Sequence, residues 1–144
     1  MKHLILAALV TLPFGAFAQD TASPEGARVY FVNLDDGATV SSPVTVVFGL
    51  EGMGVAPAGT EKENTGHHHL LLNRPPLGEG ETGEEEFIYG LPADENHMHF
   101  GGGQTQTTLE LTPGEHTLQL VLGDMGHVPH DPPVMSEQIT IVVE

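Results

Sequence analysis

The sequence contains no cysteine, and only four of its 144 residues are Lys or Arg. Without cysteine the chain cannot form a disulfide, a thiolate metal site or a cysteine nucleophile. Against these few basic residues stand 20 Asp and Glu, and the formal net charge is −16. This charge excludes nucleic acid and an anionic membrane surface as electrostatic partners, and it attracts cations and basic partners instead.

An apolar segment opens the chain. Lys2 precedes an almost wholly apolar run from Leu4 to Phe17, and Ala16-Phe17-Ala18 is a small-x-small cleavage site. This pattern is typical of a cleavable secretory signal peptide and is too short for a membrane span. The short signal and the lack of cysteine favour the periplasm of a Gram-negative bacterium, with extracellular release as the alternative. We expect a signal peptide over residues 1–18, an N-terminal tail over 19–27 and a single domain over 28–144.

The rest of the chain shows no helical periodicity, and its β-branched runs are separated by turns that contain Gly and Pro. The clearest alternation lies in Val44 to Leu50, where Val44, Val46 and Phe48 fall on one face. Short strands with turns between them predict an all-β fold, an immunoglobulin-like antiparallel β-sandwich of about seven strands, with a small barrel as the alternative. The expected strands are residues 28–34, 44–50, 67–73, 97–100, 106–111, 116–122 and 138–143.

Three stretches are expected to be loops, at residues 52–66, 74–86 and 123–135. The second is rich in Pro, Gly and Glu, and this composition predicts a mobile, solvated insert. The third contains three prolines, which cannot donate to a sheet ladder and therefore indicate an ordered loop.

Histidine is the unusual feature. Seven of the eight histidines after the signal lie in the clusters His67-His68-His69, His97-Met98-His99 and His127-Val128-Pro129-His130. In a strand, residues i and i+2 share a face about 6.6 Å apart, so His67 pairs with His69, and His97 with His99. Two such imidazoles can reach one ion because metal–nitrogen bonds are about 2.0 Å long. The predicted ligands are His67, His69, His97, His99, His127 and His130.

Two other histidines receive structural interpretations. His116 follows the turn Pro113-Gly114 and is expected to donate a hydrogen bond to the backbone. His68 points to the face opposite His67, on the side of Leu70, and is expected to pack in the core.

The identity of the metal stays open between copper and zinc. Imidazole suits both ions, and thioether sulfur favours Cu(I). Met98 and Met125 adjoin the clusters and are candidate soft ligands, which tilts the choice towards copper, although Met also fills core gaps. Calcium is disfavoured because the acidic residues are not spaced like a ligand loop. With an ordinary histidine pKa near 6.5, protons are expected to displace the metal between about pH 7 and 5.

Three motifs resemble a known bacterial family. They are Gly66-His67-His68-His69-Leu70-Leu71, the segment Asn96 to Thr105, and Pro113 to Leu118 with the following loop Asp124 to Pro133. The chain is similar over about Val29 to Val143 to the secreted proteins of domain-of-unknown-function family forty-three ninety-nine. The resemblance implies a small exported β domain and no particular activity.

Catalysis has little support, because the chain has no Gly-x-Ser-x-Gly elbow, phosphate loop or His-Glu-x-x-His motif. Our first hypothesis is an exported, non-enzymatic metal-binding protein that handles or stores copper or zinc. The second is an interaction sandwich whose histidines only brace loops. The third is a copper metalloenzyme such as an oxidase or dismutase, which requires an open coordination position. The expected partners are a metal ion and a periplasmic protein.

Overall fold

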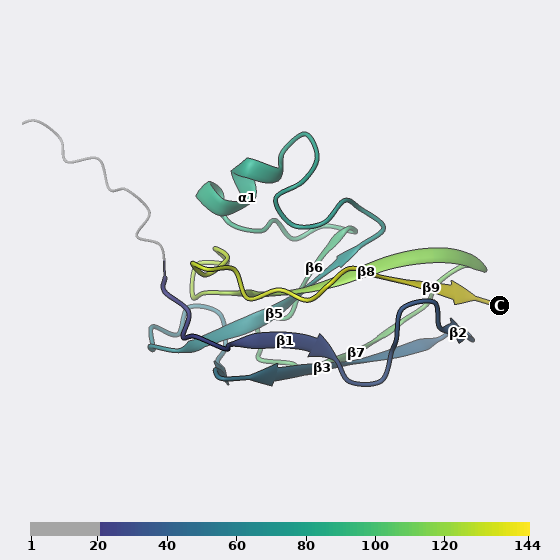
Figure 1. Cartoon of the computed structure of the whole chain (residues 1–144), viewed down its shortest axis with the longest axis horizontal. Helices are drawn as coiled ribbons and strands as arrows, with labels where there is room; N and C mark the ends of the chain where they lie inside the picture. Colours follow the sequence, from purple (N-terminus) through teal and green to yellow (C-terminus); the bar gives the residue numbers. More distant parts are fainter. Residues whose placement is uncertain (1–20) are drawn as a thin grey trace, which may run out of the picture.

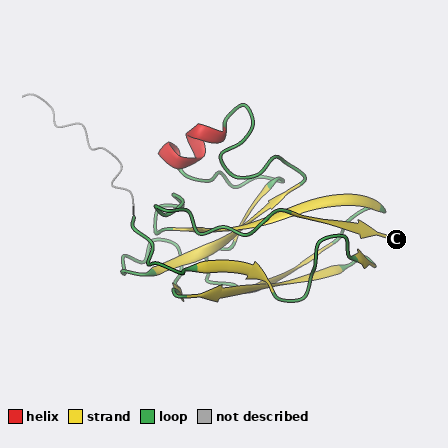
Figure 2. Ribbon diagram, in the orientation of Figure 1, coloured by secondary structure: helices red, strands yellow, loops and turns green. Residues whose placement is uncertain are grey.

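The computed structural model describes residues 21–144, so the predicted signal peptide lies outside it. The described residues form nine strands and one helix (Figure 2). In chain order these are β1 (Arg28–Phe31), β2 (Thr39–Val40), β3 (Val44–Glu51), β4 (Gly54–Val55), β5 (Thr65–Leu72), α1 (Gly83–Tyr89), β6 (His97–His99), β7 (Gln106–Leu109), β8 (Gly114–Gly123) and β9 (Ile139–Val143).

The strands form two layers, which confirms the predicted all-β sandwich. One sheet has the order β1-β3-β7, and the other has the order β2-β9-β8-β5-β4 with β6 also paired to β5 (Figure 1). All seven expected strands are present with shifted ends. The two strands that the sequence did not predict, β2 and β4, have two residues each and pair in parallel with β9 and β5, so the larger sheet is not wholly antiparallel.

The main core fills the space between the two sheets. It includes Val46 and Phe48 from β3, which face Leu70 of β5 and Leu120 of β8, and each of these side chains is at most 5% exposed. Burying one aliphatic side chain of this kind contributes about 1.5–3 kcal/mol relative to leaving it in water. Strand β3 therefore alternates because its inward-facing side chains are buried between the sheets, as the sequence indicated.

The outer face of the larger sheet carries a second, smaller apolar cluster. Leu71 of β5 and Val121 of β8 pack there against Leu77, Leu91 and Phe87. In Figure 1 the segment with α1 lies on this side of the sheet, opposite β1 and β3. Strand β5 is therefore buried on both faces, which explains why its sequence shows no alternation of polar and apolar residues.

The expectation of a mobile loop over residues 74–86 was wrong in part, because α1 begins inside it. Glu84, Glu85 and Glu86 occupy the first turn, where negative charge interacts favourably with the helix dipole. Phe87 then packs on the outer cluster and Glu86 is buried, so packing fixes a helix of seven residues that is too short to show a periodic pattern. Among residues 21–144 no helix has the length and apolar character needed to cross a bilayer.

Candidate metal centre

Four histidines converge on one point at the end of the larger sheet. They are His67, His69, His99 and His127, and each offers a ring nitrogen that lies within 4.8 Å of the other three. The four rings lie close together in tilted or edge-on arrangements, with centroid separations between 4.6 Å, for His99 and His127, and 5.8 Å, for His69 and His127. All three sequence clusters thus contribute to one group.

The sheet register brings three of these rings together. His67 and His69 share the outer face of β5, where they alternate with the inward-facing His68. Strand β6 pairs with β5 so that His99 lies directly across from His69. Directly opposed residues in an antiparallel pair project to the same face, so His99 joins the β5 pair.

The fourth ring comes from the loop that follows β8. His127 Nδ1 lies 3.0 Å from His67 Nε2, and His67 Nε2 lies 3.0 Å from His69 Nε2. The His127 backbone is in the left-handed region, with φ of 69°, which is uncommon for a residue with a side chain. A conformation of this kind persists only when its surroundings hold it in place.

Asp124 holds the loop that carries His127. Its Oδ1 accepts hydrogen bonds from the N–H groups of Gly126, at 2.8 Å, and of Val128, at 3.0 Å. The other oxygen, Oδ2, accepts a hydrogen bond of 2.6 Å from the Thr21 hydroxyl. Thr21 belongs to the segment expected to be an N-terminal tail, and its carbonyl also accepts a hydrogen bond from the N–H of Asp131.

Two glycines leave room for the rings. A Cβ atom on Gly123 would lie 2.8 Å from His69 Nε2, and one on Gly101 would lie 2.3 Å from His99 Cε1. Both separations are shorter than van der Waals contact, so any side chain at either position would push the neighbouring ring away. The sequence analysis missed Gly123, Asp124 and Gly101 as parts of the site, although all three lie in or beside the motifs that carry the family resemblance.

Burial keeps the inner rings neutral. Burial, together with the neighbouring His127 and His99, lowers the pKa of His67 to about 4. Burial and the adjacent His67 lower the pKa of His69 to about 2, and burial also lowers the pKa of His99. Neutral imidazole is the form that binds metal ions, and at these inner rings protons compete at lower pH than the expected window of 7 to 5.

The centre is open on one side. His67 and His69 are fully buried, whereas His99 and His127 are partly exposed. A cavity of about 700 Å³ lies nearby, lined by Thr21, residues 60–65, Asp124 and Met125. None of the four histidines lines that cavity, so access to the centre is through its own rim.

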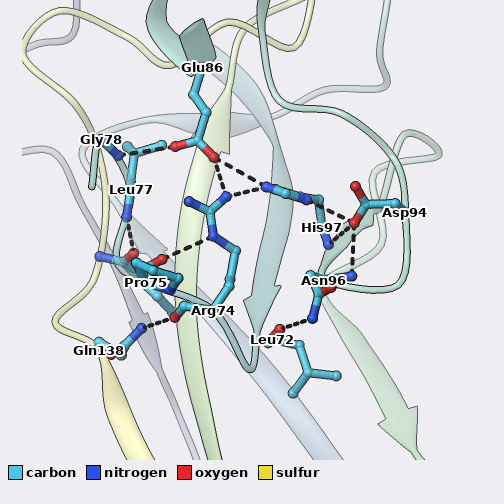
Figure 3. A network of polar contacts seen from close by, with 11 residues as sticks. Leu72, Arg74, Pro75, Leu77, Gly78, Glu86, Asp94, Asn96, His97 and Gln138 are labelled. Carbon is cyan, nitrogen blue, oxygen red and sulfur yellow. Dashed lines mark hydrogen bonds and ion pairs between the residues drawn. The ribbon is translucent and has the colours of Figure 1, made fainter. Parts of the chain in front are cut away.

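The structure places His97 outside the group, in a buried polar network (Figure 3). His97 Nδ1 lies 2.8 Å from Asp94 Oδ1, and its Nε2 contacts Arg74 and lies 3.2 Å from Glu86 Oε1. Arg74 and Glu86 form an ion pair in which the two side chains are 10% and 4% exposed. Both ring nitrogens of His97 are therefore engaged, although His97 and His99 share a face as expected.

The structure also places His130 outside the group. Its Nδ1 lies 3.2 Å from the carbonyl oxygen of Leu122, and its Nε2 lies 3.3 Å from that of Thr65. The ring thus bridges the backbones of β8 and β5. His116 contacts the Thr112 carbonyl through Nε2 at 2.8 Å, in line with its expected role at the backbone.

His68 and the two candidate methionine ligands lie elsewhere. His68 packs in the core against Phe48, with a centroid separation of 5.1 Å, and its ring does not reach the centre. Met98 lies across from Leu70 and packs against the same core, because it alternates with His97 and His99 along β6. Met125 is 41% exposed and lines the neighbouring cavity.

Comparison with protein families found one match. The family described as "Domain of unknown function (DUF4399)" matches residues 46–144, which include every residue of the centre. Comparison with curated proteins and with solved structures found no match.

Proposed function

This chain belongs to the DUF4399 family, and we propose that it is an exported, non-enzymatic protein that binds a copper or zinc ion through His67, His69, His99 and His127. The single observation that carries the proposal is the convergence of four ring nitrogens within 4.8 Å. Four nitrogens at about 2.0–2.1 Å from a tetrahedral ion lie about 3.3 Å from one another. Two separations in the group are 3.0 Å, close to this value, and the widest is at most 4.8 Å, so the rings would converge slightly to enclose an ion.

The donor set supports copper or zinc over harder ions. All four donors are imidazole nitrogens, which suit zinc and copper, whereas calcium and magnesium take oxygen ligands. The depressed pKa values of His67 and His69 keep two donors deprotonated without help from the metal. No carboxylate belongs to the group among the described residues, and the ion would keep its full positive charge.

Partial exposure favours an exchangeable ion over a purely structural one. Four protein ligands leave no open coordination position, which disfavours catalysis at the ion. Here two ligands lie on the rim, so a donor or acceptor of the metal can approach through His99 and His127. The net charge of −16 concentrates cations around the molecule and raises their rate of encounter with the rim. Both features support a role in metal handling or storage, outside the cytoplasm as the signal-like N-terminal segment predicts.

A bracing role explains other histidines but not these four. His97, His116 and His130 each contact backbone or polar side chains through both ring nitrogens. In contrast, the Nδ1 atoms of His67 and His69 are buried without a hydrogen-bond partner, and their Nε2 atoms face other rings. A role in supporting loops does not explain why these four imidazoles face one another.

The proposal is tested by metal stoichiometry. The purified chain is saturated with Zn(II) or Cu(II), dialysed, and its metal content measured by atomic emission. We expect one ion per chain, and loss of that ion in the double variant His67→Ala/His69→Ala. His116→Ala is the matched control, because it removes a buried histidine outside the group and should keep the ion. Equal metal content in the double variant and the parent chain would refute the proposal.

A further inference from the structure

We infer that the centre selects divalent ions, Cu(II) and Zn(II), and releases copper when a one-electron reductant converts Cu(II) to Cu(I). The inference rests on the proposed function and concerns the oxidation state of the ion that the site retains. It is carried by the positions of the four methionines in the described part of the chain, which pack against the core or lie on the exposed surface.

Two methionines are held in the core between the sheets. Met98 projects from β6 to the face opposite His99, and both Met98 and Met53 pack against the main apolar cluster. A thioether on that side is separated from the ring nitrogens by the sheet itself. Met98 would have to leave the core, or β6 would have to change register, before its sulfur could reach an ion at the centre.

The other two methionines are on the outside, where Met125 is 41% and Met135 is 45% exposed. Met125 lines the cavity formed with Thr21 and residues 60–65, to which the four histidines do not contribute. Met135 pairs across from Val121, which itself pairs across from His69. It therefore lies about 10 Å from His69 at the spacing of two strands, with Val121 between them.

The chain also contains no cysteine, and the four donors that converge are all imidazole nitrogens. Soft sulfur ligands select Cu(I), whereas imidazole nitrogen suits Cu(II) and zinc. Among divalent ions, Cu(II) binds more strongly than zinc at a given nitrogen site. The reductant would give one electron to the bound Cu(II), the bonds from copper to the four imidazoles would break, and the Cu(I) would form bonds to a sulfur-containing acceptor.

The test compares the two oxidation states directly. Affinity for Cu(II) and Zn(II) is measured by competition with a chromophoric chelator, and affinity for Cu(I) by competition with bicinchoninate under anaerobic ascorbate. We expect the parent chain to bind Cu(I) at least about tenfold more weakly than Cu(II). The variant His99→Met places a thioether on the exposed rim without disturbing the core, and it should shift the preference towards Cu(I) by about the same factor or more.

Two controls separate the possible failures. His99→Ala should weaken both oxidation states, and His116→Met should change neither, because His116 lies outside the group. Equal or tighter retention of Cu(I) by the parent chain, with Cu(II) binding still dependent on His67 and His69, would overturn this inference and leave the proposed function intact. Absence of any histidine-dependent binding would overturn both.

Discussion

His67 and His69 occupy positions where histidine is normally costly. Both side chains are fully buried, and each has an Nδ1 atom without a hydrogen-bond partner in the described part of the chain. An unsatisfied buried polar atom costs about 1–3 kcal/mol, so two leucines here would be expected to give a more stable domain. Groups that lower stability in this way are concentrated at functional sites, which agrees with a role for these rings in binding an ion.

The buried histidines should make the metal-free protein less stable in mild acid. When the pKa of a histidine is lower in the folded than in the unfolded chain, the unfolded chain binds more protons. The free energy of unfolding therefore decreases as the pH is lowered. For His68 burial lowers the pKa from 6.5 to about 4, so its contribution is complete above pH 6.5 and is lost as the pH falls towards 4. Chemical denaturation at several pH values should show this decrease, with a shallower slope in His68→Leu. The same slope in both proteins would contradict the assignment.

Gly123 should be required for metal binding rather than for folding. In Gly123→Ala the new methyl group would lie 2.8 Å from His69 Nε2, so the ring must move away from the other donors. We expect a loss of zinc affinity of about tenfold or more, which isothermal titration calorimetry can measure. Gly54→Ala is the matched control, because the nearest atom to its new Cβ is 3.6 Å away. Unchanged affinity in Gly123→Ala would show that the His69 ring is not a ligand.

At the scale of elements, strand β5 contributes side chains both to the core and to the candidate site. Its inner face contributes His68 and Leu70 to the main core, and its outer face presents His67 and His69. The sequence predicted this division, because alternate residues of a strand must face opposite sides. Packing on both faces then fixes the two rings in place more firmly than a surface loop could.

Which other histidines join the β5 pair could not be predicted from the sequence. Both His97 and His99 project to the outer face, and only the register of β6, with His99 across from His69, decides between them. A strand of three residues carries too little pattern to specify register. The position of His127 depends on a left-handed backbone and on contacts from Asp124 and Thr21, more than 100 residues apart, that no local pattern reveals.

Replacing Asp124 should weaken metal binding, because Asp124 holds the loop that carries His127. Asp124→Ala removes the hydrogen bonds to the Gly126 and Val128 N–H groups and to the Thr21 hydroxyl. We expect metal affinity to fall by about 10–100-fold, as is typical when a group that supports a ligand is removed. The exposed Asp35 provides a control, since Asp35→Ala makes the same change in charge at a distant turn. A fall of equal size in both variants would point to net charge instead of loop geometry.

The segment with α1 should be anchored by its buried ion pair. Burial raises the pKa of Glu86, but hydrogen bonds from Arg74 and from the Gly78 N–H outweigh it, and the net pKa is lowered. Glu86→Gln leaves Arg74 without its charged partner, and removing one member of a buried pair typically costs about 3–5 kcal/mol. Urea denaturation should show a large part of this loss, whereas Glu85→Gln, on the exposed side of the same helix, should change stability little. Equal stability of the two variants would contradict a structural role for the pair.

At the scale of the whole molecule, the alternating strands and turn-forming residues predicted the two-layer architecture and left a small barrel as the alternative, which the two separate sheets exclude. Val46 and Phe48 on one face of β3, and Leu118, Leu120 and Leu122 on one face of β8, leave a sandwich as the simplest way to bury both sets. Helix α1 was missed because a run of glutamates resembles a solvated loop until Phe87 and Glu86 are seen to be anchored against the sheet.

Binding of an ion should stabilise the whole domain. A ligand that binds only the folded chain adds about 2.7 kcal/mol at a free concentration one hundred times its Kd. For a domain of this size we expect the melting temperature to rise on the order of 10 °C with Zn(II), and to return to its starting value with a chelator. Differential scanning calorimetry measures both values, and the His67→Ala/His69→Ala variant should show neither change. A shift that persists in the variant would indicate zinc binding elsewhere.

The pairing of Thr21–Ser23 with Asp131 and Pro132 joins the first described residues of the chain to a segment near its end. Because this pairing and the Thr21–Asp124 hydrogen bond hold the loop of His127, the fourth ring is fixed only when segments more than 100 residues apart have met. A nascent chain with strands β5 and β6 alone presents three imidazoles and an incomplete cage. If the chain binds an ion as proposed, all four rings can surround that ion only after these two distant segments have paired.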